Sequence, residues 1–119
     1  RQVPSDNQLN LENTIRHAID VGINHIETAR GYGSSELQLG QILPKLPREK
    51  LIIQTKISPK SDVREFRCQF NQSFQFLNLD YIDLLGIHGI NTLELLEETM
   101  RPGGCLDEAK KLQKQGKVR

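Results

Sequence analysis

Three short apolar segments, separated by segments with helical periodicity, constrain the fold of this chain more than any other feature. The apolar segments lie at 23–27, 50–56 and 81–88, and turn-forming or charged residues bound them. Such runs are typical of buried β-strands. Because strands that alternate with helices form βαβ units, the pattern predicts the α/β fold class with a parallel sheet.

The helices between these strands are predicted from apolar residues at intervals of three and four. Ser34 or Ser35 can cap the second helix, and Ser61 with Asp62 can begin the third. Glycine or proline follows the first two helices, as expected at a helix end. The predicted helices cover about 11–21, 34–43, 61–77, 91–99 and 104–115, and residues 117–119 would begin a fourth strand.

Composition excludes several classes of protein. The 119 residues have room for one domain, and 16 basic against 15 acidic residues leave a net charge of +1. This balance favours neither nucleic acid nor an anionic membrane as a partner, and no apolar run reaches membrane-spanning length. The two cysteines, Cys68 and Cys105, lack metal-ligand spacing. We therefore expect reduced thiols in a cytoplasmic protein, and no metal site.

Four side chains that can hold or transfer protons lie at or just beyond the carboxyl ends of the predicted strands. Glu27 and Tyr32 follow the first strand, Lys56 ends the second, and His88 ends the third. Parallel strands with crossovers of the same hand have their carboxyl ends on one side of the sheet. We therefore expect these four candidate catalytic residues to converge.

Their chemistry suits the reduction of a carbonyl group. Tyrosine is a weak acid with a pKa of about 10, and a nearby ammonium group favours its ionised form by roughly 1 to 3 pKa units. We expect Lys56 to supply that charge to Tyr32, the general acid, and Glu27 to orient Lys56 through an ion pair of about 4 Å or less. His88 could hydrogen-bond the carbonyl oxygen. The hydride must come from a cofactor, because no side chain can deliver one.

Three of the four assignments have a structural alternative. Tyr32 could be a turn residue half-packed on the surface, Lys56 a solvated strand end, and His88 a core histidine whose hydrogen bonds are satisfied. His17 and His25 match no catalytic motif, and we interpret both as structural.

The segments GINHIETARGYGSSELQLGQIL, LIIQTK and LDYIDLLGIH resemble, in order and spacing, blocks of the aldo-keto reductase family. The ending LDEAKKLQKQGKVR is similar to the fourth helix and the start of the fifth strand of that family. The resemblance implies that Tyr32 donates the proton, with Lys56 and His88 beside it. The family usually has aspartate at the position of Glu27, so the ion pair with Lys56 should survive with altered geometry.

The resemblance also implies a partial (β/α)8 TIM barrel, in which the three predicted strands are strands two to four with their flanking helices. Residues 1–119 would form the N-terminal part of a single barrel domain, because a complete barrel needs roughly 250 residues. The family holds its nicotinamide cofactor mainly with segments that would follow Arg119. The cofactor-binding residues are therefore unassigned.

The implied function is NADPH-dependent reduction of a small aldehyde or ketone. We expect the 119-residue fragment alone to be inactive, and its open sheet edges to favour self-association. The alternative is a reductase-like binding or regulatory subunit without turnover, similar to potassium-channel β subunits or the regulatory subunit of glutamate–cysteine ligase. Retention of Tyr32, Lys56 and His88 favours the enzyme.

Overall fold

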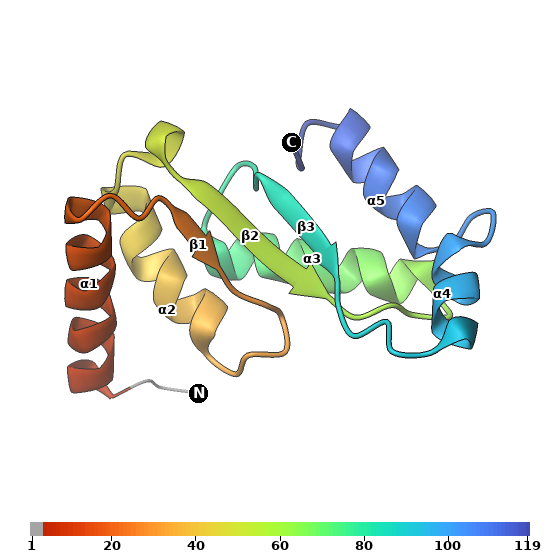
Figure 1. Cartoon of the computed structure of the whole chain (residues 1–119), viewed down its shortest axis with the longest axis horizontal. Coiled ribbons are helices and arrows are strands. Elements are labelled where there is room, and N and C mark those ends of the chain that lie inside the picture. The colour runs from red at the N-terminus through yellow and green to blue at the C-terminus, as the bar shows by residue number, and fades with distance from the viewer. Residues whose placement is uncertain (1–3) are drawn as a thin grey trace.

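The protein, seen here in a computed structural model that describes residues 4–119, has three parallel strands with helices against one face of the sheet (Figure 1). Strands and helices alternate along the chain, so the predicted α/β class is confirmed. In chain order the elements are α1 (Ser5–Asp20), β1 (His25–Glu27), α2 (Ser35–Ile42), the 3-10 turns η1 (Leu43–Lys45) and η2 (Arg48–Lys50), β2 (Ile52–Ile57), α3 (Val63–Leu77), β3 (Leu84–Ile87), α4 (Leu93–Met100) and α5 (Cys105–Lys114).

The sheet has the order β1–β2–β3, and both pairings are parallel. Glu27 is in register with Gln54, and Lys56 with Gly86. The predicted fourth strand is reduced to a single parallel bridge between Ile82 and Val118, beside β3. This bridge shows that the end of the chain returns to the sheet.

The largest difference between the predicted and observed helix ends is at the start of α1, and the other ends agree to within two residues. Helix α1 begins at Ser5 rather than near residue 11, because the amides of Asn7 and Gln8 donate to the Pro4 carbonyl and start the helix. This turn is polar and therefore lacks apolar periodicity. Gln8 also donates from its side chain to the carbonyl oxygen of Gln38, a contact that periodicity does not report.

Of the two predicted helix caps, the one at α3 is confirmed and the one at α2 is not. The Asp62 carboxylate accepts a hydrogen bond from the Arg64 amide at 2.9 Å and caps α3 as expected. Ser34 precedes α2, but its hydroxyl donates to the side chain of Gln38 rather than capping the helix. Pro44 does not stop the helical path at once, since proline is tolerated in a first turn and here lies within η1.

The core lies between the sheet and the helices. Ile53, Thr55 and Ile57 of β2 are fully buried on the helix side. The predicted apolar stripe of α3 faces them, with Phe66, Phe70 and Leu77 fully buried. The opposite face of the sheet is open in the described residues, and Ile52 and Leu84 are exposed there. Among the described residues, the strands are thus buried on the face that carries the helices.

Gly40 allows α2 and α3 to approach closely, which yields a stability prediction. A Cβ at this position would lie 1.9 Å from the backbone oxygen of Phe76. Gly40→Ala should lower the free energy of unfolding, measured by chemical denaturation, by about 1–3 kcal/mol. The cost arises because the clash is with the backbone of α3, and neither helix backbone can move away easily.

The control is Gly31→Ala, where an added Cβ meets no atom within 4 Å. In an unobstructed helix, Gly→Ala would stabilise the protein by about 1 kcal/mol. A more stable Gly40→Ala variant would therefore show that the two helices do not pack as described.

Candidate active site

The loop that carries Tyr32 is held to the end of β2. The amides of Thr28 and Arg30 donate to the carbonyl oxygens of Gln54 and Lys56, both at 2.9 Å. These bonds continue the β1–β2 ladder beyond the end of β1. The loop then turns, with the Tyr32 amide donating to the Ala29 carbonyl at 3.0 Å.

A side-chain hydrogen bond also joins the two ends of this loop. The hydroxyls of Thr28 and Ser35 lie 2.7 Å apart and share a hydrogen bond. The Ser35 amide also donates to the Tyr32 carbonyl oxygen at 3.0 Å, at the start of α2. Tyr32 is therefore presented by a short loop with fixed ends, although its side chain is 49% exposed.

The four candidate residues predicted from the sequence come together at the carboxyl ends of the strands. Lys56 Nζ donates to Glu27 Oε1 at 2.7 Å and to Tyr32 Oη at 3.2 Å. The His88 ring meets the Tyr32 ring edge-on, with the centroids 5.6 Å apart. The predicted ion pair between Lys56 and Glu27 is confirmed. The catalytic roles of the four residues stay predictions.

Strand register explains this convergence. Side chains alternate across a strand, so Glu27 and Lys56 can both project to the open face of the sheet, away from the helices. His88 directly follows β3, and its amide donates to the Ile57 carbonyl at 2.9 Å. That bond holds the end of β3 level with the end of β2.

Gly86 is a positioning residue that the sequence analysis missed. It lies opposite Lys56 in the β2–β3 register. A Cβ at this position would lie 2.9 Å from Lys56 Cγ, so glycine provides the space in which the lysine stem lies. The sequence did contain a signal for this role, because a glycine inside a predicted strand often marks a place where another group approaches the backbone closely.

Mutual attraction shifts the pKa values of the Lys56–Glu27 pair in opposite directions. The hydrogen bond from Lys56, and then its charge, lowers the pKa of Glu27. The hydrogen bond to Glu27 raises the pKa of Lys56, burial partly opposes this effect, and the hydrogen bond to Tyr32 adds to it. The Glu27 side chain is 51% exposed, so the pair should contribute little to stability. Its effect is to hold Lys56 charged and oriented.

Further from the carboxyl ends of the strands, the side chains of His25 and Gln54 form a hydrogen bond, with His25 Nε2 and Gln54 Oε1 3.0 Å apart. His25 shares the open face with Glu27, because the two are alternate residues of β1. This contact agrees with a structural role for His25. Sequence reasoning did not single out Gln54, because a lone glutamine in a strand carries no motif.

Behind the sheet, Glu36 connects α2 to β2. Its carboxylate is almost fully buried, accepts a hydrogen bond from Thr55 Oγ1 at 2.7 Å, and pairs with Arg30 at 3.3 Å. Sequence reasoning missed this residue as well, because a glutamate in the first turn of a helix usually lies in solvent. These contacts fix α2, and so the loop before it, against the central strand.

Two further properties bear on function. No set of three or more His, Cys, Asp or Glu side chains within residues 4–119 is placed to hold a metal ion. Over the same range, none of the helices has the length and apolar character needed to span a membrane.

Comparison with known proteins gives concordant results. The model of the aldo/keto reductase family matches residues 4–119. An NADH-specific methylglyoxal reductase of Escherichia coli is 32% identical over 96% of this chain and 40% of its own length. A protein of Glycine max named probable aldo-keto reductase 1 is 35% identical over 88% of this chain and 32% of its own length.

A solved structure shows the same fold. A crystal structure from Pseudomonas aeruginosa, assigned to the aldo-keto reductases, superposes with a TM-score of 0.80 and 27% identity. The match covers 99% of this chain and 46% of the other. The chain therefore spans less than half the length of the proteins that it matches here.

The Lys56–Glu27 contact predicts the titration of Glu27. Its side-chain carboxyl resonance, followed by NMR, should have a midpoint below the ordinary value of 4.5. The pair is then present above the lowered pKa and is lost as the pH falls through it. Lys56→Met should move the midpoint upward, whereas Lys50→Met, at an exposed lysine before β2, should not. An unchanged midpoint in Lys56→Met would contradict the pair.

The space at Gly86 predicts a second effect on the same resonance. Gly86→Ala should displace the lysine stem, weaken its contact with Glu27, and raise the Glu27 midpoint. Leu84→Ala, on the same strand and the same face, adds no atoms and serves as the control. If Gly86→Ala titrates like the unmodified protein, Lys56 does not depend on this glycine.

Proposed function

The chain belongs to the aldo/keto reductase family, and from this premise we propose that it carries the proton-transfer part of a carbonyl reductase. The observation behind the proposal is the series of hydrogen bonds from Glu27 through Lys56 to Tyr32, with His88 beside it. The proposed reaction reduces a small aldehyde or ketone to an alcohol.

Hydrogen-bond direction supports Tyr32 as the general acid. A lysine ammonium group can only donate, so Tyr32 Oη is the acceptor in its contact with Lys56. The phenolic hydrogen is therefore free to point toward a substrate. When that proton leaves, the ammonium group 3.2 Å away stabilises the negative charge left on the oxygen.

Lys56 and Glu27 act on the reaction by positioning and charge. Glu27 accepts from Lys56 and keeps Nζ on the open face of the sheet, within reach of the phenol. Glutamate thus makes this contact where the family usually has aspartate. Neither side chain needs to exchange a proton with the substrate.

His88 is proposed to bind the carbonyl oxygen together with Tyr32. Negative charge develops on that oxygen during reduction, and hydrogen-bond donors already in place lower the barrier. The edge-on contact with the Tyr32 ring and the backbone bond to Ile57 keep the imidazole beside the phenol.

The donor set fits carbonyl reduction by a nicotinamide cofactor, because a proton donor and a second hydrogen-bond donor side by side suit a carbonyl oxygen that gains charge as it accepts a hydride. A bound reduced nicotinamide supplies the hydride. Tyr32 and His88 would lie against the reacting group. The glycine-flanked loop does not suit the cofactor's phosphates, because the amides of Tyr32 and Ser35 are already bonded to loop carbonyls.

We propose NADPH as the donor on the basis of the family resemblance. The E. coli relative is named for its NADH specificity, so both nucleotides belong in the assay. The substrate class remains a small carbonyl compound.

The chain is also proposed to supply strands two to four of a (β/α)8 barrel, as the N-terminal part of one domain. Three features support this: the parallel order β1–β2–β3, the bridge of Val118 to Ile82 just before β3, and the exposed apolar residues Ile52 and Leu84 on the open face. A closed barrel would cover that face.

Tyr32→Phe tests the proposed function in the intact protein. Turnover of an aldehyde panel with NADPH or NADH should fall roughly 10²- to 10⁴-fold, the range for a lost general acid, with cofactor affinity nearly unchanged. Tyr81→Phe is the matched control, because this second tyrosine lies before β3, at the opposite end of the sheet.

Wild-type turnover in Tyr32→Phe would refute the assignment of the general acid. If the intact, unmodified protein binds a nicotinamide nucleotide but reduces no compound of the panel, the result supports the alternative of a binding or regulatory subunit.

A further inference from the structure

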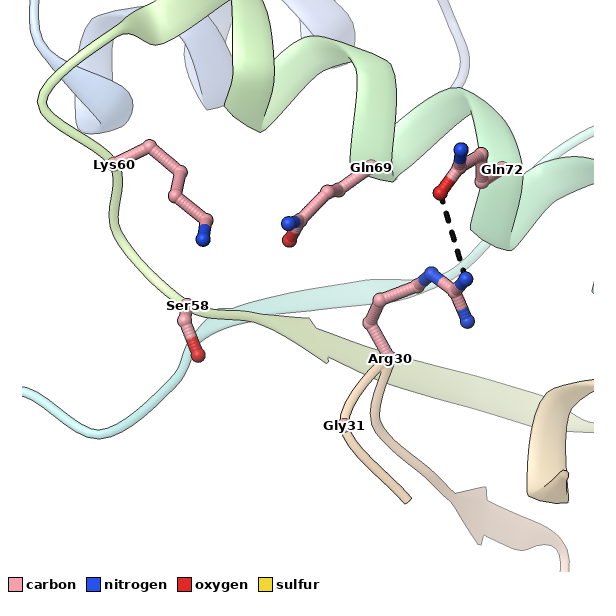
Figure 2. A pocket seen from close by; sticks show the side chains of 6 residues that line it. All are labelled: Arg30, Gly31, Ser58, Lys60, Gln69 and Gln72. Atoms are coloured by element: carbon pink, nitrogen blue, oxygen red, sulfur yellow. Dashed lines mark hydrogen bonds between the residues drawn. The ribbon is translucent and has the colours of Figure 1, made fainter. Parts of the chain in front are cut away.

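A polar hollow of about 340 Å³ lies between the end of β2 and helix α3 (Figure 2). Its lining comes from the β1–α2 loop, the β2–α3 loop and α3. The lining residues are Arg30, Gly31, Ser58, Lys60, Gln69 and Gln72. Figure 2 shows Lys60 and Gln69 extending into the hollow from two different segments, with Arg30 on the other side.

The hollow is separate from the candidate active site. Arg30 points to the helix side of the sheet, where its guanidinium pairs with Glu36 and lies 4.5 Å from the centre of the Phe76 ring. Tyr32, two residues later, contacts Lys56 on the open face. The loop thus presents one side chain to each side of the sheet.

The side chains that line the hollow offer hydrogen-bond donors that suit an anion, and each of the two cations is also paired with a carboxylate outside the lining. Its lining, drawn entirely from described residues, contains two cations and no carboxylate. The acidic neighbours lie outside it: Glu36 pairs with Arg30 at 3.3 Å, and the exposed Glu65 pairs with Lys60 at 3.2 Å. An ammonium group has three N–H donors, so Lys60 has donors left for a ligand.

One wall of the hollow, formed by Arg30, is held in place by contacts within the protein. Arg30 donates to Glu36 from one terminal nitrogen and to Gln72 from the other, and it also stacks on Phe76. These contacts fix the guanidinium at one wall. Lys60 is less constrained, because its single ion pair is with a solvent-exposed carboxylate. Lys60 can therefore adjust to a ligand held against Arg30.

We propose that this hollow binds a small phosphate group, either as inorganic phosphate or as part of a small ester, between Arg30 and Lys60. Charge-assisted hydrogen bonds from guanidinium and ammonium groups are the usual means of holding phosphate. The oxygens of a tetrahedral anion point in different directions, so they can accept hydrogen bonds from donors on opposite walls. The side-chain amide of Gln69 can donate a further hydrogen bond. This proposal does not depend on the proposed reductase activity.

The test is an NMR titration of the ¹⁵N-labelled protein with inorganic phosphate, with sodium chloride balancing the ionic strength. Saturable shifts should appear at the amides of Ser58, Lys60 and Gln69. Lys60→Gln should weaken binding roughly tenfold, since it removes one charge-assisted hydrogen bond. Lys50→Gln, at an exposed lysine before β2, is the charge-matched control and should bind as the unmodified protein does.

Gln69→Ala is a second variant, which changes no charge and should weaken binding less than Lys60→Gln. A parallel titration with methyl phosphate distinguishes the source of the ligand: tighter binding than phosphate supports an ester, and weaker binding supports the free anion. Shifts that do not saturate, or equal affinity in Lys60→Gln and Lys50→Gln, would overturn the proposal. None of these measurements requires catalysis, so they can fail while the reductase proposal holds.

Discussion

The parallel pairing of β2 with both of its neighbours is the constraint on which the rest of the structure depends. Because β1 and β3 run in the same direction as β2, the carboxyl ends of all three strands lie at the same end of the sheet. Glu27, Lys56 and His88 meet there only because the strands are in this register. A slip of one residue in β2 would turn Lys56 toward the helices and separate it from Glu27 and Tyr32.

The helix side of β2 maintains that register. A buried carboxylate is costly unless it is paired and hydrogen-bonded, and Glu36 meets both conditions through Thr55 and Arg30. Helix α2 is therefore attached to the central strand by a polar contact as well as by apolar packing. Arg30 belongs to the loop that presents Tyr32, so the same contact restrains the candidate active site and forms one wall of the polar hollow.

The open face of the sheet has a different character. The contact between Lys56 and Glu27 is partly solvated, so it adds little to folding but fixes the direction of one ammonium group. That direction depends on Gly86, which leaves room for the lysine stem. Stability thus comes from the helix side, where apolar residues and Glu36 are buried, while the face that carries the candidate chemistry remains accessible.

The sequence alone determined the alternation of strands and helices, the carboxyl ends of the strands to within one residue, and the four candidate residues, because periodicity and strand termini are local features. Tertiary structure alone decided that Gly86 faces Lys56, that His25 bonds Gln54, and that Glu36 is buried. It also decided which strand face stays open and where Arg30 and Lys60 form a hollow. These features join residues distant along the chain, and such contacts leave no periodic pattern in either segment. Local pattern could therefore indicate which residues reach the edge of the sheet, whereas only packing could decide which side chains touch there.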